Sequence, residues 1–171
     1  MSVVLDIGCG RAKTAGAIGI DRIVAPEVDI VHDLNRVPWP LEDARFEIVI
    51  CSHILEHLAD IVATLNEIHR VSRPGARIKI TTPHFSSLNS WEDPTHLHHF
   101  ARRSFSFFDT TSRHCYTSGQ LRMISAEVFF GGGLWDWVSR CQYKFLPDLW
   151  EKHLCFIWRA RNLSVELEVI K

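Results

Sequence analysis

The chain has 171 residues and a formal net charge of −1 at pH 7, so it lacks the global basic field typical of nucleic-acid-binding proteins. Its 46% apolar composition is ordinary for a globular domain, and no uncharged run approaches the about 18 residues that a membrane span needs. The first apolar run is too short for a signal peptide. The five cysteines form no C-x-x-C pair, which favours a reduced, cytoplasmic protein.

The first predicted strand lies at residues 3–7, where a short run rich in β-branched residues is typical of a buried parallel strand. Asp6 lies inside its end, and Gly8 and Gly10 follow with a spacing that lets a backbone approach a ligand closely. Glycines after a strand also form plain tight turns. Whether these glycines indicate a ligand site therefore depends on the elements that follow them.

Four more strand patterns follow in the first half of the chain, each ending in a polar or small residue. The second ends at residues 19–21, and the others lie at 28–34, 46–51 and 77–82. Between the last two, an apolar stripe from Leu58 to Val71 has helical spacing, and Pro74-Gly75 is expected to end that helix. Ligands of open α/β sheets bind in the crevice at the carboxyl ends of the strands.

The crossover between the first two strands is too short for a normal helix. Only Arg11 to Ala17 separate the glycines from the second strand, whereas a crossover with its helix takes at least about 10–12 residues. A dinucleotide needs that helix, because its pyrophosphate sits on the helix N-terminus. The sequence therefore argues against a nicotinamide-dependent oxidoreductase.

The second half of the chain has a different character. Residues 83–108 contain four histidines and six aromatic residues, and a short helix is expected at 102–108. Strands are expected at 121–130 and 163–170, and an aromatic-rich insertion separates them at about 131–160, with a helix at 152–160. Three roles stay open for the insertion: packing on the sheet, contact with a second copy of the chain, or a wall of the acceptor pocket.

Taken together, the segments VLDIGCG, GID, VHDL, FEIVICSHILEHL, RPGARIKITTPH and DPTHLHHF resemble class I S-adenosylmethionine-dependent methyltransferases, of the methyltransferase type 11-like kind. The resemblance implies a single domain over residues 1–171 with a Rossmann-like, mainly parallel seven-stranded sheet and an antiparallel C-terminal strand pair. It implies methyl transfer from S-adenosylmethionine to a small molecule, whose identity the sequence does not give. The alternative is a non-catalytic nucleoside-binding or scaffold domain of the same fold.

The resemblance also implies which residues bind S-adenosylmethionine. Asp21 would bind the ribose hydroxyls, and Asp33 would lie near the adenine amino group with the Leu34 backbone beside the ring. The methionine end and the methyl group would be held by two further groups of residues: Asp6, Gly8, Cys9 and Gly10 after the first strand, and Ser52 and His53 after the fourth. Asp21 and Asp33 could also be simple turn formers, and Asp6 a buried acid that only ties down the glycine loop. Ser52 could be a helix cap, Cys9 a packing residue, and Glu56-His57 the start of the following helix.

The acceptor side is less determined by the sequence. An oxygen or nitrogen acceptor can need a general base, and histidine is the usual choice near neutral pH. The candidates are His84, His96, His98 and His99, although each single histidine has a structural alternative. The histidines at 96–99 together with Asp93 also raise the question of a metal, but ligands on one short segment rarely close a shell around an ion. No metal site is therefore expected, and the predicted partners are a small-molecule acceptor and a second copy of the chain.

Overall fold

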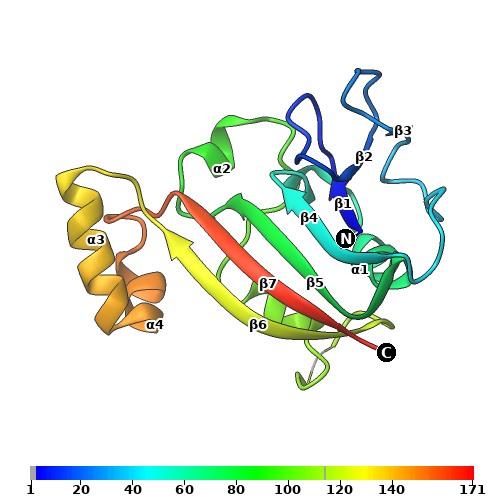
Figure 1. Ribbon diagram of the computed structural model, residues 1–171. Coiled ribbons are helices and arrows are strands. Elements are labelled where there is room, and N and C mark those ends of the chain that lie inside the picture. The colour runs from blue at the N-terminus through cyan, green and yellow to red at the C-terminus, as the bar shows by residue number, and fades with distance from the viewer. Residues whose placement is uncertain (1–2, 114) are drawn as a thin grey trace.

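The computed structural model describes residues 3–113 and 115–171 (Figure 1). In this part of the chain seven strands form one sheet in the order β3-β2-β1-β4-β5-β7-β6. β1 to β5 pair in parallel, and β7 runs antiparallel to both β5 and β6. The predicted fold class is confirmed, with strands β1 (Val4–Ile7), β2 (Ile18–Asp21), β3 (Ile30–Val31), β4 (Phe46–Ser52), β5 (Ser72–Pro83), β6 (Gln120–Phe129) and β7 (Asn162–Ile170).

The central strands are placed by their apolar side chains. Leu5 of β1 lies opposite Val49 of β4 and Ile18 of β2, and Leu5 and Val49 are fully buried. In β7 buried and partly exposed residues alternate along the strand, which is the pattern of a sheet with one face in the core and the other toward solvent. On the solvent side Arg77 and Glu166 form an ion pair at 3.6 Å.

The crossover from β1 to β2 contains only turns and no helix, as its length predicts. The expected strand at 28–34 is wrong in length, because β3 is only Ile30–Val31. The Asp29 carboxylate before it accepts hydrogen bonds from the Gly19 backbone and from Lys13. The Asp33 side chain after it closes a turn onto Asn35. Side chains that bond to the backbone in this way compete with strand pairing.

Helix α1 (Ile61–Val71) packs its predicted apolar stripe into the core. Asp60 caps its first turn by accepting a hydrogen bond from the Ala63 backbone N–H at 2.8 Å. The helix ends at Val71, so the prediction that Pro74-Gly75 ends it is wrong. Ser72 is already extended, at φ −87° and ψ 148°, while its hydroxyl donates to the Ile68 carbonyl. The turn residues Pro74-Gly75 instead fall within β5.

The remaining helices are short, apart from one that the sequence analysis missed. The expected helix at 102–108 is a 3₁₀ helix, η2 (Ser104–Phe108), and α2 (Asn89–Glu92) is a single turn. The missed helix is α3 (Leu134–Phe145), which begins directly after the glycine run. The helix expected at 152–160 lies earlier, as α4 (Pro147–Leu149) and one π-helical turn, η3 (Trp150–Leu154). None of the helices in the described residues is long and apolar enough to cross a membrane.

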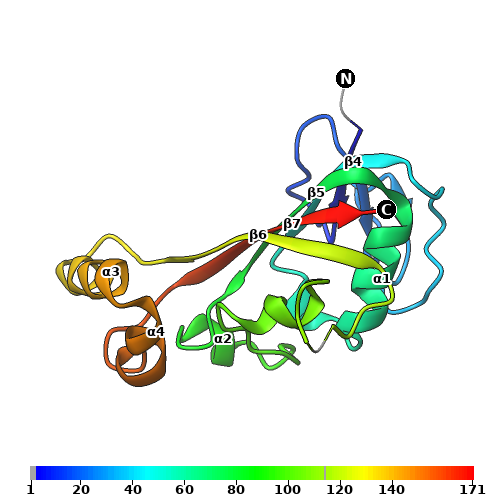
Figure 2. The same cartoon turned by 90° about the horizontal axis from the view of Figure 1, so that it is seen from below.

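The aromatic-rich insertion extends beyond the end of the β6–β7 ribbon (Figures 1 and 2), where α3 and α4 lie apart from α1. Trp150 is fully buried and packs edge-on against Phe130 and Tyr143. Most other large apolar side chains here are exposed, including Trp135 at 67% and Phe145 at 76%. Packing on the core therefore accounts for only part of the insertion.

Candidate functional site

A pocket of about 290 Å³ lies at the carboxyl ends of the parallel strands. Residues that follow β1, β2 and β4 line it, together with residues of the segment after β3. Five of the predicted binding residues meet there although they are spread over 46 positions of the sequence: Gly8, Asp21, Asp33, Leu34 and His53. This is the crevice in which open α/β sheets bind ligands.

Asp21 ends β2 and joins the glycine segment to the pocket. Its Oδ2 accepts a hydrogen bond from the Gly10 backbone N–H at 2.8 Å, and its Oδ1 accepts one from the Ile23 N–H at 3.1 Å. A carboxylate has about four lone-pair sites, so each oxygen keeps capacity for another donor. The side chain is therefore held in place by the backbone and can still accept hydroxyl donors from the pocket.

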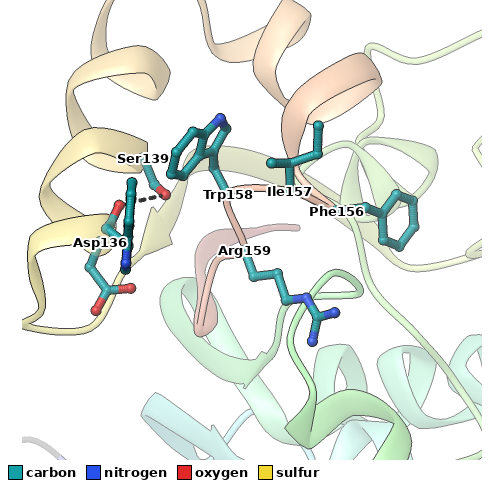
Figure 3. A pocket seen from close by; sticks show the side chains of 7 residues that line it. Asp136, Ser139, Phe156, Ile157, Trp158 and Arg159 are labelled. Carbon is teal, nitrogen blue, oxygen red and sulfur yellow. Dashed lines mark hydrogen bonds between the residues drawn. The ribbon is translucent and has the colours of Figure 1, made fainter.

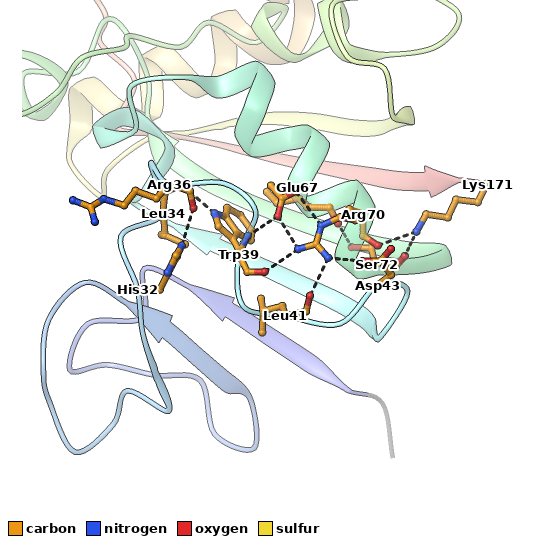
Figure 4. A network of polar contacts seen from close by, with 11 residues as sticks. His32, Leu34, Arg36, Trp39, Leu41, Asp43, Glu67, Arg70, Ser72 and Lys171 are labelled. Carbon is orange, nitrogen blue, oxygen red and sulfur yellow. Dashed lines mark hydrogen bonds and ion pairs between the residues drawn. The ribbon is translucent and has the colours of Figure 1, made fainter.

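Asp33 and Leu34 form the wall beyond β3. Asp33 Oδ1 accepts hydrogen bonds from the backbone and the side-chain amide of Asn35, at 3.1 and 3.2 Å. The bond from the backbone N–H lowers the pKa of the Asp33 carboxyl, so it is charged at neutral pH. Leu34 is buried, and its carbonyl accepts a hydrogen bond from the Trp39 indole at 3.0 Å (Figure 4).

The glycines after β1 have positive φ, +67° at Gly8 and +51° at Gly10, which side chains rarely tolerate. A Cβ at Gly8 would lie 2.4 Å from Cγ1 of Ile54. Gly8 is thus restricted both by its backbone and by its neighbour, and its N–H donates to the Ile20 carbonyl at 2.8 Å. The loop can approach a ligand closely only with glycine at this position.

Asp6, Cys9 and Gly10 belong to β1 and the glycine loop but do not line the pocket. Asp6 is buried, and its Oδ2 accepts a hydrogen bond from the Thr14 backbone N–H at 2.7 Å. Cys9 is also buried, and burial raises the pKa of its thiol, so it stays neutral. In the structure the Asp6 carboxylate ties the segment after the glycines to β1, and the Gly10 backbone is bound to Asp21.

Ser52 ends β4 and His53 follows it, but the two side chains border different hollows. Ser52 borders a different hollow, on the solvent face of the sheet, with Lys79 and Thr81. His53 lines the strand-end pocket and has the unusual φ of +52°, while its backbone N–H donates to the Thr81 carbonyl at 2.8 Å. Glu56-His57 do not start α1 but form a 3₁₀ turn of their own, η1 (Leu55–His57).

His84 lies in the core, with no exposed surface. The Ser86 backbone N–H donates to its Nδ1 at 3.2 Å, so the ring proton is on Nε2, which faces Oε1 of Glu151 at 3.1 Å. Burial alone would raise the pKa of Glu151, but the hydrogen bonds from His84 and from the Arg102 backbone hold it below its usual value. This arrangement suits a charged anchor between β5 and η3.

The three later histidines point to different places. His96 packs edge-on against His57, with ring centroids 4.6 Å apart, beside the strand-end pocket. His98 and His99 border a separate pocket of about 450 Å³, with the start of α1 and Phe108. His99 stacks on Trp91 at 3.7 Å. Of the three, His96 lies nearest to residues that line the strand-end pocket.

Sequence reasoning missed several residues that line this pocket, among them Arg22, Ile23, Asn35, His57 and Thr95. Arg22 and Ile23 come directly after Asp21, and Asn35 comes directly after Leu34. Their place in the sequence beside predicted binding residues could therefore have indicated that they line the pocket. His57 belongs to a quoted motif but was expected to start a helix. Thr95 contacts His57 although the two residues are 38 positions apart in the sequence. No local sequence pattern predicts that contact.

A larger pocket of about 600 Å³ lies on the aromatic-rich insertion (Figure 3). Trp135, Asp136 and Ser139 of α3 line it on one side, and Phe156 to Arg159 line it on the other. It holds neither of the strand-end carboxylates, Asp21 and Asp33. We therefore take the smaller strand-end pocket as the candidate site.

Comparisons with known proteins agree with this geometry. A protein from Mycolicibacterium smegmatis, described as a probable S-adenosylmethionine-dependent methyltransferase, is 31% identical over 148 residues; the match covers 77% of this chain and 56% of that protein. The chain thus spans little more than half the length of that relative.

Solved structures show the same fold. An S-adenosylmethionine-dependent methyltransferase from Archaeoglobus fulgidus superimposes with a TM-score of 0.68 at 20% identity, covering 98% of this chain and 86% of that one. One from Mesorhizobium loti gives 0.53 at 17% identity, covering 98% and 90%. At such identities the likeness concerns the fold alone. The family profile described as "Methyltransferase domain" matches residues 2–124, most of the chain, and the chain therefore belongs to this family of class I S-adenosylmethionine-dependent methyltransferases.

Proposed function

We propose that this chain transfers the methyl group of S-adenosylmethionine to a small-molecule acceptor. The observation that carries the proposal is the convergence of Gly8, Asp21, Asp33 and Leu34 on one strand-end pocket. When bound, S-adenosylmethionine supplies an electrophilic methyl group on a sulfonium.

The donor and acceptor chemistry of the pocket fits that group. The ribose offers two hydroxyl donors, and Asp21 offers two fixed carboxylate oxygens with free lone pairs. The adenine has an amino donor and an apolar face, and charged Asp33 lies next to buried Leu34. The site carries no helix N-terminus for a pyrophosphate, since the β1–β2 crossover holds only turns. The pocket thus favours a nucleoside without phosphates over a dinucleotide.

The chain's own contribution to methyl transfer is alignment and exclusion of water. The glycine loop leaves room for the methionine end, with Asp6 holding that loop through Thr14. His53 borders the pocket at the end of β4 and can contact the methionine portion or the acceptor. The candidate general bases remain His84, His96, His98 and His99, of which His96 lies beside the pocket-lining His57.

The first prediction concerns Asp21. Asp21→Asn is expected to weaken binding of S-adenosylhomocysteine, measured by isothermal titration, by about 1–3 kcal/mol, or about 5- to 150-fold, because a charged acceptor of two hydroxyls is lost. Asp29→Asn is the matched control, since Asp29 also accepts a backbone N–H near the glycine loop but does not line the pocket. Equal affinity in Asp21→Asn and the wild type would remove Asp21 from the ribose role.

The enzyme is distinguished from a non-catalytic binding domain by turnover. Incubation with S-adenosylmethionine and fractionated small metabolites is expected to produce S-adenosylhomocysteine from at least one fraction. Binding of S-adenosylmethionine without turnover on any fraction would favour the non-catalytic alternative. Binding of NAD with no affinity for S-adenosylmethionine would overturn both.

We also propose that a second copy of the chain binds the insertion, in the cytoplasm. Large contiguous exposed apolar patches mark interaction sites, and Trp135, Trp137, Phe145 and Ile157 are all more than 60% exposed. The five cysteines are free, which suits a reducing compartment. Sedimentation is expected to show a concentration-dependent dimer that Trp135→Glu disrupts. Val24→Glu, at an even more exposed apolar position outside the insertion, should leave it intact. A wild-type monomer at every concentration contradicts the proposal.

A further inference from the structure

Three side chains with metal-ligating chemistry meet beside the strand-end pocket. Glu56 and His57 belong to η1, and His96 lies after α2, yet one ligand atom of each lies within 4.8 Å of the other two. Backbone hydrogen bonds join the two segments, because the N–H groups of Leu97 and His98 donate to the Glu56 carbonyl at 2.7 and 3.3 Å. The cluster is therefore a built feature of the fold, not a chance approach of mobile side chains.

Glu56 is the unusual member of the cluster. It is 1% exposed, and both of its carboxylate oxygens are buried without a hydrogen-bond partner among the described residues. His53 Nδ1 lies 3.3 Å from Oε1, within ion-pair distance but outside hydrogen-bond geometry. Buried charges in proteins are paired or coordinate metals. Glu56 thus lacks the partners that a buried carboxylate normally has.

Hydrogen bonds hold the Nδ1 atoms of His57 and His96 and leave the Nε2 atoms free to bind an ion. The Thr95 hydroxyl donates its proton to Asp93 at 2.6 Å, so it can only accept from His57 Nδ1, 3.0 Å away. The Ser90 carbonyl likewise can only accept from His96 Nδ1, at 3.1 Å. In the neutral form of each ring, these assignments leave the lone pair on Nε2. Metal-binding histidines are typically anchored through their second nitrogen in this way.

We propose that Glu56, His57 and His96 bind a divalent first-row transition-metal ion, with Zn²⁺ the best match. Two imidazoles and one carboxylate are the protein ligands of open zinc sites, in which water or substrate fills the fourth position. The same set also suits Fe²⁺. Asp93 lies beside the site, with its Oδ2 3.9 Å from His96 Nε2, and adds negative charge. The donor set disfavours Mg²⁺ and Ca²⁺, which prefer oxygen ligands.

The ion would lie at the edge of the strand-end pocket, because His57 and Thr95 both line it. A metal ion there lowers the pKa of a bound hydroxyl or water and can take the place of a histidine base. This catalytic role of the ion rests on the proposed methyl transfer. The proposal that the three residues bind a metal ion does not depend on it. Metal binding can be measured without S-adenosylmethionine, so the two proposals fail separately.

The test is titration of the chelator-treated 171-residue chain with Zn²⁺ and, in parallel, Co²⁺. One equivalent is expected to bind, and the Co²⁺ complex should show visible d–d bands without the sulfur charge-transfer band that cysteine ligation would add. Glu56→Gln and His96→Gln are each expected to lower Zn²⁺ affinity by at least about 100-fold. Thr95→Val, which removes the anchor of His57 together with the hydroxyl bond to Asp93 but no proposed ligand, is expected to lower it by about 10- to 100-fold.

His99→Gln is the matched control, because His99 lies on the same segment but contacts Ser90 and Trp91 instead of the cluster. Its Zn²⁺ affinity should equal that of the wild type. Circular dichroism and thermal melting without metal show whether each variant is folded. If Glu56→Gln does not fold, His96→Gln and Thr95→Val carry the test. Absence of binding to the wild type, or equal affinity in the folded ligand variants, overturns the proposal.

Discussion

Replacing Arg70 by methionine is expected to lower the free energy of unfolding by about 3 kcal/mol at neutral pH. Arg70 of α1 donates to Glu67 through Nη2 at 2.8 Å and through Nε at 3.0 Å (Figure 4). It also donates to the carbonyls of Trp39 and Leu41, at 3.0 and 2.9 Å. Methionine fills similar volume but removes a charged donor from the buried Glu67 carboxylate and a donor from each of the two carbonyls, so Glu67 keeps the Trp39 backbone N–H but loses its ion pair.

The pH dependence identifies the charge as the cause. Burial alone would raise the pKa of Glu67, but hydrogen bonds from Arg70 and from the Trp39 backbone hold it below its usual value. A carboxyl with a depressed folded pKa stabilises the fold above its unfolded pKa of about 4.3, and this contribution is lost as the pH falls through the folded value. The stability difference between wild type and Arg70→Met should therefore be largest at pH 7 and narrow below about pH 4.

Urea unfolding at pH 7 and at pH 3 measures both quantities. Arg73→Met is the matched control, because Arg73 pairs with Glu47 at the surface, at 2.6 Å with both side chains more than a third exposed. Such a pair contributes at most about 1 kcal/mol. A stability difference for Arg70→Met that stays constant with pH would show that lost packing, and not the ion pair, is responsible.

The parts of the site that the sequence predicted correctly are those fixed by the sheet. Once the strands are recognised, the order of an α/β sheet brings their carboxyl ends to one edge. Asp21 ends β2, Asp33 lies beyond β3 and Gly8 follows β1, so their meeting needs no knowledge of the loops. The truncated crossover was also predictable, because the segment between the first two strands has too few residues for a helix.

The parts that were missed depend on which loop folds back onto which. Glu56 and His96 are 40 positions apart, and His84 and Glu151 are 67 apart. Their contacts arise where irregular segments cross the sheet edge, and neither periodicity nor strand order constrains those paths. Helix α3 was missed for another reason: most of its aromatic side chains face solvent, so its apolar pattern does not mark a buried face.

His84→Leu is expected to lower the free energy of unfolding by about 3 kcal/mol, and thereby the melting temperature by about 6–12 °C. The ring is fully buried, and its Nε2–H donates to Glu151, whose carboxylate also accepts the Arg102 N–H at 2.8 Å. Leucine preserves most of the volume but leaves the Glu151 charge with one partner fewer. Urea unfolding measures the loss of stability. The affinity for S-adenosylhomocysteine, measured separately, should change little.

A double-mutant cycle with Glu151→Gln separates an anchor from a general base. If His84 mainly stabilises the Glu151 charge by its hydrogen bond, the double variant should be more stable than His84→Leu alone, because the poorly compensated buried charge is removed. A general base gives the opposite signature: His84→Leu would melt like the wild type, while turnover falls by about 10²–10⁴-fold with cofactor affinity intact. The burial of His84 and the engagement of both its ring nitrogens favour the anchor, and unchanged melting of the single variant would exclude it.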